Sequence, residues 1–222
     1  MRTTLLSDDE FQQLTDGAEV IAQTRFGNGA LRAPDGRIIK ILRPQRLLSS
    51  GFFRPQAHRF VAAARRLGEM GIPAPRVTDV YRITSENRYV LRYHPVPGVE
   101  LRNAATEDHL LAFACFIADL HGRGIYFRGL HLGNVVVDDA GRFGLIDCAA
   151  TCFGRRPLPV ARRARNFRPL AVTKNDIDLL RQVGLTRFFD AYLDTADLTP
   201  TTRHRLMTAV AATHPAYKEL RP

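Results

Sequence analysis

The segment from Leu120 to Cys148, LHGRGIYFRGLHLGNVVVDDAGRFGLIDC, constrains the fold most, because it predicts a tight β-hairpin between two polar ends. Its turn is centred on Asp139–Gly141, and apolar residues flank the turn: Val135, Val136 and Val137 before it, Phe143, Leu145 and Ile146 after it. An antiparallel hairpin brings its ends together, so Asn134 and Asp147 should lie side by side. Amide and carboxylate oxygens suit Mg²⁺, which takes water and phosphate oxygens as its other ligands. The sequence therefore predicts a magnesium site for a nucleotide phosphate.

The rest of the chain divides into a strand-rich half and a helical half. We expect a short helix and lead-in over residues 1–17, a long helix at 55–70, and strands at 18–24, 30–32, 37–42, 76–83 and 88–94. The glycines of RFGNG, residues 25–29, permit a tight turn. After Pro95-Val96-Pro97-Gly98, which has the composition of a connector, helices are predicted at 106–122, 176–183, 187–193 and 200–212, whereas the basic residues 155–168 carry little periodicity. The predicted fold class is α+β, with a boundary at 95–98.

Composition excludes several classes of protein. No apolar run approaches the ~20 residues that a membrane span needs, and the start, MRTTLLSDDEF, turns acidic too early for a secretory signal. The three cysteines are odd in number and lack the spacing of metal ligands, which favours free thiols in a cytoplasmic protein.

The net charge of +10 predicts an anionic partner. Its densest source is RRPLPVARRARNFR, which holds six arginines, and arginine forks suit phosphate groups. The candidate partners are a phosphorylated glycolipid, an anionic membrane surface and nucleic acid, and the alternative is a solvated basic face. Apart from Phe167, aromatic residues are not interleaved with these arginines, and no nucleic-acid module is present, so nucleic acid is the least favoured partner.

Five motifs in order resemble those of a known family. The loop FRGLHLGNVVV is similar to the H-G-D-L-H-P-G-N loop of kinase-like phosphotransferases, with Leu132 in place of proline. Together with IIKIL, LGEMGIPAPRV, GLIDCA and ARRARNFRPL, it most resembles the bacterial lipopolysaccharide core kinase family, whose members act on Kdo or heptose and some of which carry a toluene-tolerance label. The resemblance covers residues 18–193. It implies a two-lobed protein-kinase-like fold: an N-lobe over 1–94 with a five-stranded antiparallel sheet and one helix, a hinge at 95–98, and a mostly helical C-lobe over 99–222 that carries the catalytic-loop hairpin.

The resemblance also implies ATP and Mg²⁺ as cofactors. Lys40 matches the lysine that contacts the ATP phosphates, while Gly27 and Gly29 correspond to the loop over them; the alternatives are an outward-facing lysine and a plain hairpin turn. Asn134 and Asp147 match the metal ligands, with a loop hydrogen bond and a capped turn as their alternatives.

Two histidines fall within the motifs. His121, near Asp119 at the end of the 106–122 helix, is expected to be structural, and His131 is expected mainly to hold the loop together.

Two positions depart from the family pattern. The catalytic aspartate should lie five residues before Asn134, but residue 129 is glycine. The 55–70 helix should offer a glutamate to the strand lysine, but its matching face carries Phe60 and alanines. Lys40 therefore lacks its usual partner or pairs with Asp147. His131 as a substitute base and Arg128 as a stabiliser of phosphoryl charge are the catalytic residues that we predict instead.

Three functional hypotheses follow. The first is an ATP- and Mg²⁺-dependent kinase of an anionic glycolipid or phosphorylated sugar, expected in the cytoplasm of a Gram-negative bacterium with a peripheral contact at the inner face of the inner membrane. The second is a pseudokinase that binds nucleotide or a partner without phosphotransfer. The third is a kinase of another substrate or a nucleic-acid-associated protein. The oligomeric state is not predicted.

Overall fold

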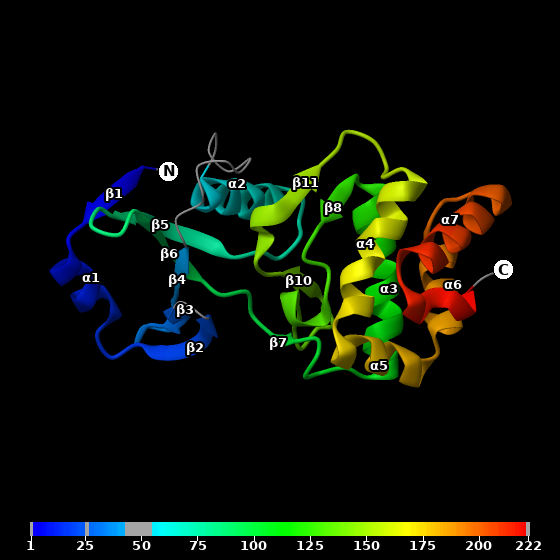
Figure 1. Cartoon of the computed structure of the whole chain (residues 1–222), viewed down its shortest axis with the longest axis horizontal. Helices are drawn as coiled ribbons and strands as arrows, with labels where there is room; N and C mark the ends of the chain where they lie inside the picture. Colours follow the sequence, from blue (N-terminus) through cyan, green and yellow to red (C-terminus); the bar gives the residue numbers. More distant parts are fainter. Residues whose placement is uncertain (1, 25–26, 43–54, 221–222) are drawn as a thin grey trace. The chain divides into compact units, whose positions relative to one another are not determined.

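The computed structural model describes residues 2–24, 27–42 and 55–220, and its fold is mixed α+β (Figure 1). The chain forms two compact units, Met1–Val96 and Pro97–Pro222. The division falls within the segment 95–98, where the sequence predicts a connector.

The N-terminal unit is a six-stranded sheet with two helices. Its elements are β1 (Thr3–Leu6), α1 (Asp8–Thr15), β2 (Glu19–Thr24), β3 (Gly27–Arg32), β4 (Ile38–Leu42), α2 (Gln56–Glu69), β5 (Arg76–Ile83) and β6 (Arg88–His94). The strand order is β1-β5-β6-β4-β3-β2. All neighbouring strands are antiparallel except β1 and β5, which are parallel.

The expected five-stranded antiparallel sheet with one helix is therefore wrong in its count and in one pairing. The sequence analysis missed β1, a four-residue edge strand in which only Leu6 is buried, so it shows no alternation of apolar and polar residues. The short helix expected near the start is α1, which makes two helices in this unit; Ser7 caps it, because the Ser7 hydroxyl and the Glu10 carboxylate bind each other's backbone N–H groups.

The two faces of this sheet pack against different helices. One face contributes Leu31, Ile39, Ile83 and Val90 to a buried cluster, against which Phe11 and Leu14 of α1 pack. The other face packs against α2, whose buried stripe is Ala57, Phe60, Ala63, Ala64 and Leu67. This stripe repeats at helical spacing, as the sequence predicts.

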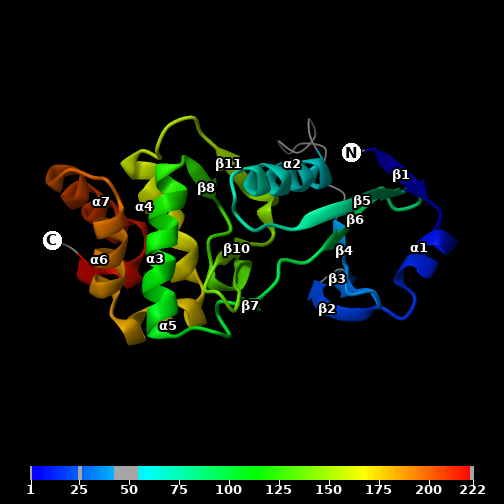
Figure 2. The same cartoon turned by 180° about the vertical axis from the view of Figure 1, so that it is seen from behind.

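The C-terminal unit is mostly helical. Its elements are β7 (Val99–Glu100), α3 (Glu107–Gly122), β8 (Ile125–Phe127), β9 (Val135–Val137), β10 (Phe143–Leu145), β11 (Thr151–Phe153), α4 (Val160–Val172), α5 (Lys174–Val183), α6 (Leu185–Thr195) and α7 (Pro200–Thr213), with short 3₁₀ turns at Leu132–Asn134, Cys148–Ala150 and Pro215–Leu220. Strands β7, β9 and β10 form one small sheet, and β8 and β11 form another. Helix α3 packs on α6 and β8, and α4 packs on α5, α7 and β8 (Figure 2).

Helix α4 lies in the basic segment, where the sequence analysis found little periodicity and predicted no helix. Ala164, Phe167 and Ala171 are buried at helical spacing, but the surrounding arginines and Pro169 conceal that pattern in the sequence. None of the described helices combines the length and apolar character that crossing a bilayer requires.

A chain of buried hydrogen bonds joins α3, α4, α6 and β8. Arg163 donates to the Tyr192 oxygen at 2.8 Å, and that oxygen lies 2.9 Å from Nδ1 of His121. His121 Nε2 lies 3.1 Å from Oδ1 of Asn166, whose Nδ2 donates to the Phe127 carbonyl at 2.6 Å. Arginine can only donate, so the Tyr192 oxygen accepts from Arg163 and its hydroxyl proton is available for Nδ1 of His121. His121 can then accept at Nδ1 and donate from Nε2 to Asn166 only if the imidazole is neutral, with its proton on Nε2. Burial lowers the pKa of His121 to about 3, which keeps it neutral. The expected structural role of His121 is confirmed.

We predict that His121 makes the fold acid-sensitive. An unfolded histidine binds a proton below about pH 6.5, whereas buried His121 does not until about pH 3, so stability falls as the pH drops through this window. Lowering the pH from 7 to 5 should reduce the free energy of unfolding by about 2 kcal/mol through this group alone. Urea unfolding of the His121→Gln variant should lack that part of the pH dependence. The exposed His204→Gln variant is the control, and equal pH slopes for both variants would contradict the prediction.

Candidate functional site

The predicted hairpin forms between β9 and β10. Val137 pairs with Phe143 and Val135 with Leu145, and Gly141 in the turn has a φ of +73°. Beyond the strands, the Ile146 N–H donates to the Asn134 carbonyl at 2.9 Å. The backbone of Asn134 therefore lies beside Ile146, one residue before Asp147.

The two predicted magnesium ligands differ in their surroundings. The half-buried Asn134 donates its Nδ2 to the Gly129 carbonyl at 3.0 Å, so the side-chain oxygen is the atom of this amide left for another ligand. Asp147 is exposed, and its φ of +52° and ψ of +45° place it in the left-handed region. Such a conformation is uncommon for a residue other than glycine and concentrates at functional sites. An amide oxygen and a carboxylate at one end of a hairpin fit the oxygen ligands that Mg²⁺ prefers.

A buried carboxylate anchors the loop that leads to Asn134. Asp176 of α5 is fully buried and accepts the Leu132 backbone N–H at 2.8 Å. Arg102 donates its Nε to the same carboxylate at 2.7 Å, which satisfies the buried charge. A Cβ added at Gly133 would lie 2.6 Å from the Arg102 guanidinium, so the arginine passes where only glycine leaves room. This ion pair fixes residues 131–134.

His131 belongs to the same network. Its Nδ1 lies 3.4 Å from an Arg102 nitrogen, and because the guanidinium can only donate, this nitrogen is the acceptor. Burial lowers the pKa of His131, while the charges of Asp176 and Asp147 act in the opposite direction. A neutral ring in this position carries its proton on Nε2, so its basic lone pair faces a cation. The geometry favours a positioning role, and the substitute-base role stays a hypothesis.

Arg128 and Gly129, which directly precede the anchored loop, have different surroundings. Gly129 supplies the carbonyl that holds Asn134, and a Cβ there would lie 2.8 Å from Asn134 Nδ2. Arg128 is exposed and lines a cavity of about 440 Å³ with Tyr126, Cys152, Arg162 and Arg165. The structure therefore groups Arg128 with the basic segment of α4.

Lys40 lies in the N-terminal unit, on the face of β4 that packs against α2. It is half-buried, and its ammonium lies 5.8 Å from the centroid of the Phe60 ring. An ammonium at this distance is attracted by the ring face. Lys40 is therefore not an outward-facing residue, and its ammonium lies over the Phe60 ring of α2.

The predicted glycine turn is only partly described. Arg25 and Phe26 lie outside the described residues, and Gly27 and Gly29 lie within β3. Gly27 has a φ of +103°, and a Cβ at Gly29 would lie 2.8 Å from the Thr24 methyl group. The local backbone and packing therefore explain why both positions are glycine, and their role over the phosphates stays a prediction.

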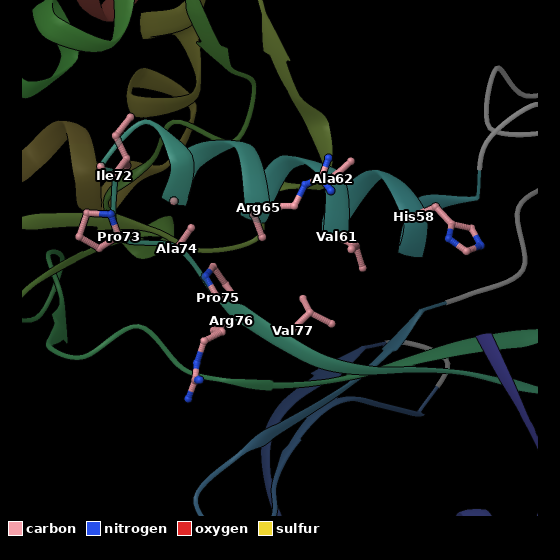
Figure 3. A pocket seen from close by; sticks show the side chains of 13 residues that line it. His58, Val61, Ala62, Arg65, Ile72, Pro73, Ala74, Pro75, Arg76 and Val77 are labelled. Carbon is pink, nitrogen blue, oxygen red and sulfur yellow. The ribbon is translucent and has the colours of Figure 1, made fainter. Parts of the chain in front are cut away.

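A larger cavity of about 930 Å³ lies between α2 and the chain leading into β5 (Figure 3). Apolar residues such as Val61, Pro73 and Val77 line it together with His58, Arg65 and Arg76. No carboxylate from the described part of the chain lines this cavity, so the lining has no acidic group to pair with a base.

The sequence analysis missed Arg102 and Asp176. Asp176 did give a signal, because it falls on the apolar face of α5 with Leu180 and Val183, where a charged residue needs a partner. Arg102 follows a two-residue strand and gives none. Within residues 2–24, 27–42 and 55–220, no three His, Cys, Asp or Glu side chains gather as a metal site.

We predict that Asp176→Ala strongly destabilises the C-terminal unit. The substitution leaves the Arg102 charge and the Leu132 N–H without their partner, a loss of about 3–5 kcal/mol for a buried pair. The control is Asp178→Ala on the same helix, where an exposed carboxylate pairs with Lys174 and should contribute less than about 1 kcal/mol. Urea unfolding measures both, and similar losses for the two variants would disprove the anchoring role.

A scan against models of known protein families finds no family that matches this chain, and a search of curated proteins finds no match either. The resemblance to the lipopolysaccharide core kinases is therefore carried by the motifs of the sequence itself.

Proposed function

We propose that this chain is an ATP- and Mg²⁺-dependent phosphotransferase with the two-lobed protein-kinase-like fold, acting on a hydroxyl group of an anionic glycolipid. The expected acceptor is an inner-core sugar of lipopolysaccharide, which would bring the protein to the cytoplasmic face of the membrane. The observation that carries this proposal is the end of the β9–β10 hairpin, where Asn134 is held by Gly129 and lies beside the residue before Asp147.

The chemistry needs few specialised groups. Phosphoryl transfer passes through a loose transition state, so positioning and electrostatic stabilisation supply most of the acceleration. Asn134 and Asp147 would hold Mg²⁺, which neutralises charge on the phosphates when bound. Lys40 would contact the nucleotide phosphates, and Phe60 would keep its ammonium on the α2 side of the sheet. The glycine at 129 provides no general base, a deficit of about 10²–10⁴-fold in rate.

A pseudokinase is the second candidate. Gly129 in place of the catalytic aspartate and Phe60 in place of the helix glutamate both favour it. Such a protein would bind nucleotide through the same residues without transferring phosphate.

We predict that Asp147→Asn abolishes Mg²⁺-dependent nucleotide binding and phosphotransfer. The substitution removes the only full negative charge proposed to bind the ion, and losses of about 10²–10³-fold are typical for one electrostatic group at such a site. The assay is transfer from labelled ATP to purified core glycolipid, with thermal stabilisation by Mg-ATP measured in parallel. Asp139→Asn, an exposed carboxylate in the turn of the same hairpin, is the matched control.

The two readouts separate the candidates. Transfer by the wild-type chain that is lost in Asp147→Asn supports the kinase, and stabilisation without transfer supports the pseudokinase. Absence of both, or equal responses of the two aspartate variants, would refute the proposed magnesium site.

We predict further that His131→Gln retains most of the transfer activity, whereas His131→Ala loses part of it. A glutamine oxygen can accept the Arg102 hydrogen bond but cannot act as a base near neutral pH, so retention indicates positioning. Rates measured from pH 6 to 9 provide the check. Loss of activity in His131→Gln, with the folded state intact by circular dichroism, would restore the substitute-base hypothesis.

A further inference from the structure

Three arginines from two parts of the C-terminal unit share one cavity. The arginine pocket, as we call it, has a volume of about 440 Å³ and is lined by Tyr126, Arg128, Cys152, Arg162 and Arg165. Each guanidinium is charged at any physiological pH. No carboxylate from the described residues lines the pocket, so its lining is strongly positive.

Regular structure places these side chains together. Tyr126 and Cys152 are direct partners across the β8–β11 ladder, so they lie on the same face of this small sheet. Arg128 follows Tyr126 by two residues. Arg162 and Arg165 are three residues apart on α4 and so lie on one side of that helix. Helix α4 packs directly on β8 (Figure 1).

Buried hydrogen bonds hold the backbone segments that carry the arginines of the pocket. Arg163, next to Arg162, is only 4% exposed and donates to the Leu158 carbonyl and to the Tyr192 oxygen, both at 2.8 Å. Asn166, next to Arg165, is 2% exposed and binds the Phe127 carbonyl, directly before Arg128. The inward-facing residues of α4 thus hold the helix to β8, which ends directly before Arg128. A site on such a framework is preorganised.

The three arginines of the pocket have no charged partner in the part of the chain that the structure describes. None of Arg128, Arg162 and Arg165 makes an ion pair or a side-chain hydrogen bond with any described residue, whereas six carboxylates of this unit pair with other basic residues. Like charges around one cavity repel one another. An anion that enters the arginine pocket would relieve this repulsion and bind guanidinium groups from all three arginines.

We propose that the arginine pocket binds the phosphate group of a phosphorylated sugar. Guanidinium forks match phosphate oxygens in pairs, and the Tyr126 hydroxyl adds a donor of the kind that binds sugars or phosphate. The volume lies in the range of small-molecule sites, which leaves space for a sugar ring beside the phosphate. That this sugar belongs to the phosphotransfer acceptor rests on the proposed function, whereas phosphate binding itself does not.

Direct binding tests this proposal without ATP or Mg²⁺. The full chain is titrated calorimetrically with glucose 6-phosphate, inorganic phosphate and glucose. We expect glucose 6-phosphate to bind more tightly than phosphate, and glucose not to bind. Arg162→Gln and Arg165→Gln should each raise the Kd for the sugar phosphate about tenfold, because each removes a charged hydrogen-bond donor. Arg168→Gln, an exposed arginine of α4 outside the lining, is the matched control.

The outcomes are distinct from those of the phosphotransfer assay. Absence of binding, or equal weakening by Arg168→Gln, overturns the arginine pocket as a phosphate site even if the chain transfers phosphate. Inorganic phosphate that binds as tightly as glucose 6-phosphate overturns the sugar assignment. A random oligonucleotide that binds more tightly, with the same arginine dependence, overturns it in favour of nucleic acid. Binding as expected supports the proposal even if no phosphotransfer is found.

Cysteine labelling provides a second measurement that needs no variant. Cys152 lines the arginine pocket and Cys115 does not, and both are half-buried free thiols. The ratio of alkylation rates with anionic iodoacetate and neutral iodoacetamide reports the local potential, because the thiolate fraction cancels. We expect this ratio to be several-fold higher at Cys152 than at Cys115, and glucose 6-phosphate to suppress labelling of Cys152 only. Equal ratios at the two cysteines, without protection, would overturn the proposal.

Discussion

The fully buried carboxylate of Asp176 joins three segments that are far apart in the sequence: helix α5, Arg102 after β7, and the backbone of Leu132. An isolated buried charge would be prohibitively costly, so this arrangement exists only while Arg102 and the Leu132 N–H are both in place. The loop in turn depends on this ion pair, because the same arginine contacts His131 and lies where a side chain at Gly133 would be. Charge pairing therefore determines where this polar loop can lie.

A second network clamps the other end of the loop. Asn166 holds the Phe127 carbonyl, and the neutral imidazole of His121 orients Asn166. The segment between Phe127 and Leu132 is thus fixed by α4 at its start and by α5 at its end, and these two helices contact each other. Two clamped ends allow little change of conformation on ligand binding, so less of the binding free energy is spent on ordering the site. The candidate magnesium ligand Asn134 and the arginine pocket both depend on this clamped segment.

Sequence reasoning succeeded where a pattern is local. The hairpin from Asn134 to Asp147 follows from alternation and from turn chemistry within fourteen residues, and the apolar stripe of α2 from a single helical period. It failed where the cause is distant: β1 is a strand because it pairs in parallel with β5, more than seventy residues later, and the ion pair of Asp176 depends on Arg102. The arginine pocket combines both cases, since the basic run is visible in the sequence but its grouping with Arg128 arises from the packing of α4 on β8.

In the proposed phosphotransferase, the departures at Gly129 and Phe60 would act differently. A missing general base slows the chemical step by about 10²–10⁴-fold, which would take an enzyme of typical turnover, about 10 s⁻¹, to roughly 10⁻¹–10⁻³ s⁻¹. The cation–π contact between the Lys40 ammonium and the Phe60 ring, of about 0.5–2 kcal/mol, favours a position of the ammonium on the α2 side. Neither position takes part in the hydrogen bonds that hold Phe127 and Leu132. The proposed recognition of a phosphorylated sugar by the arginine pocket therefore does not depend on whether the chain transfers phosphate.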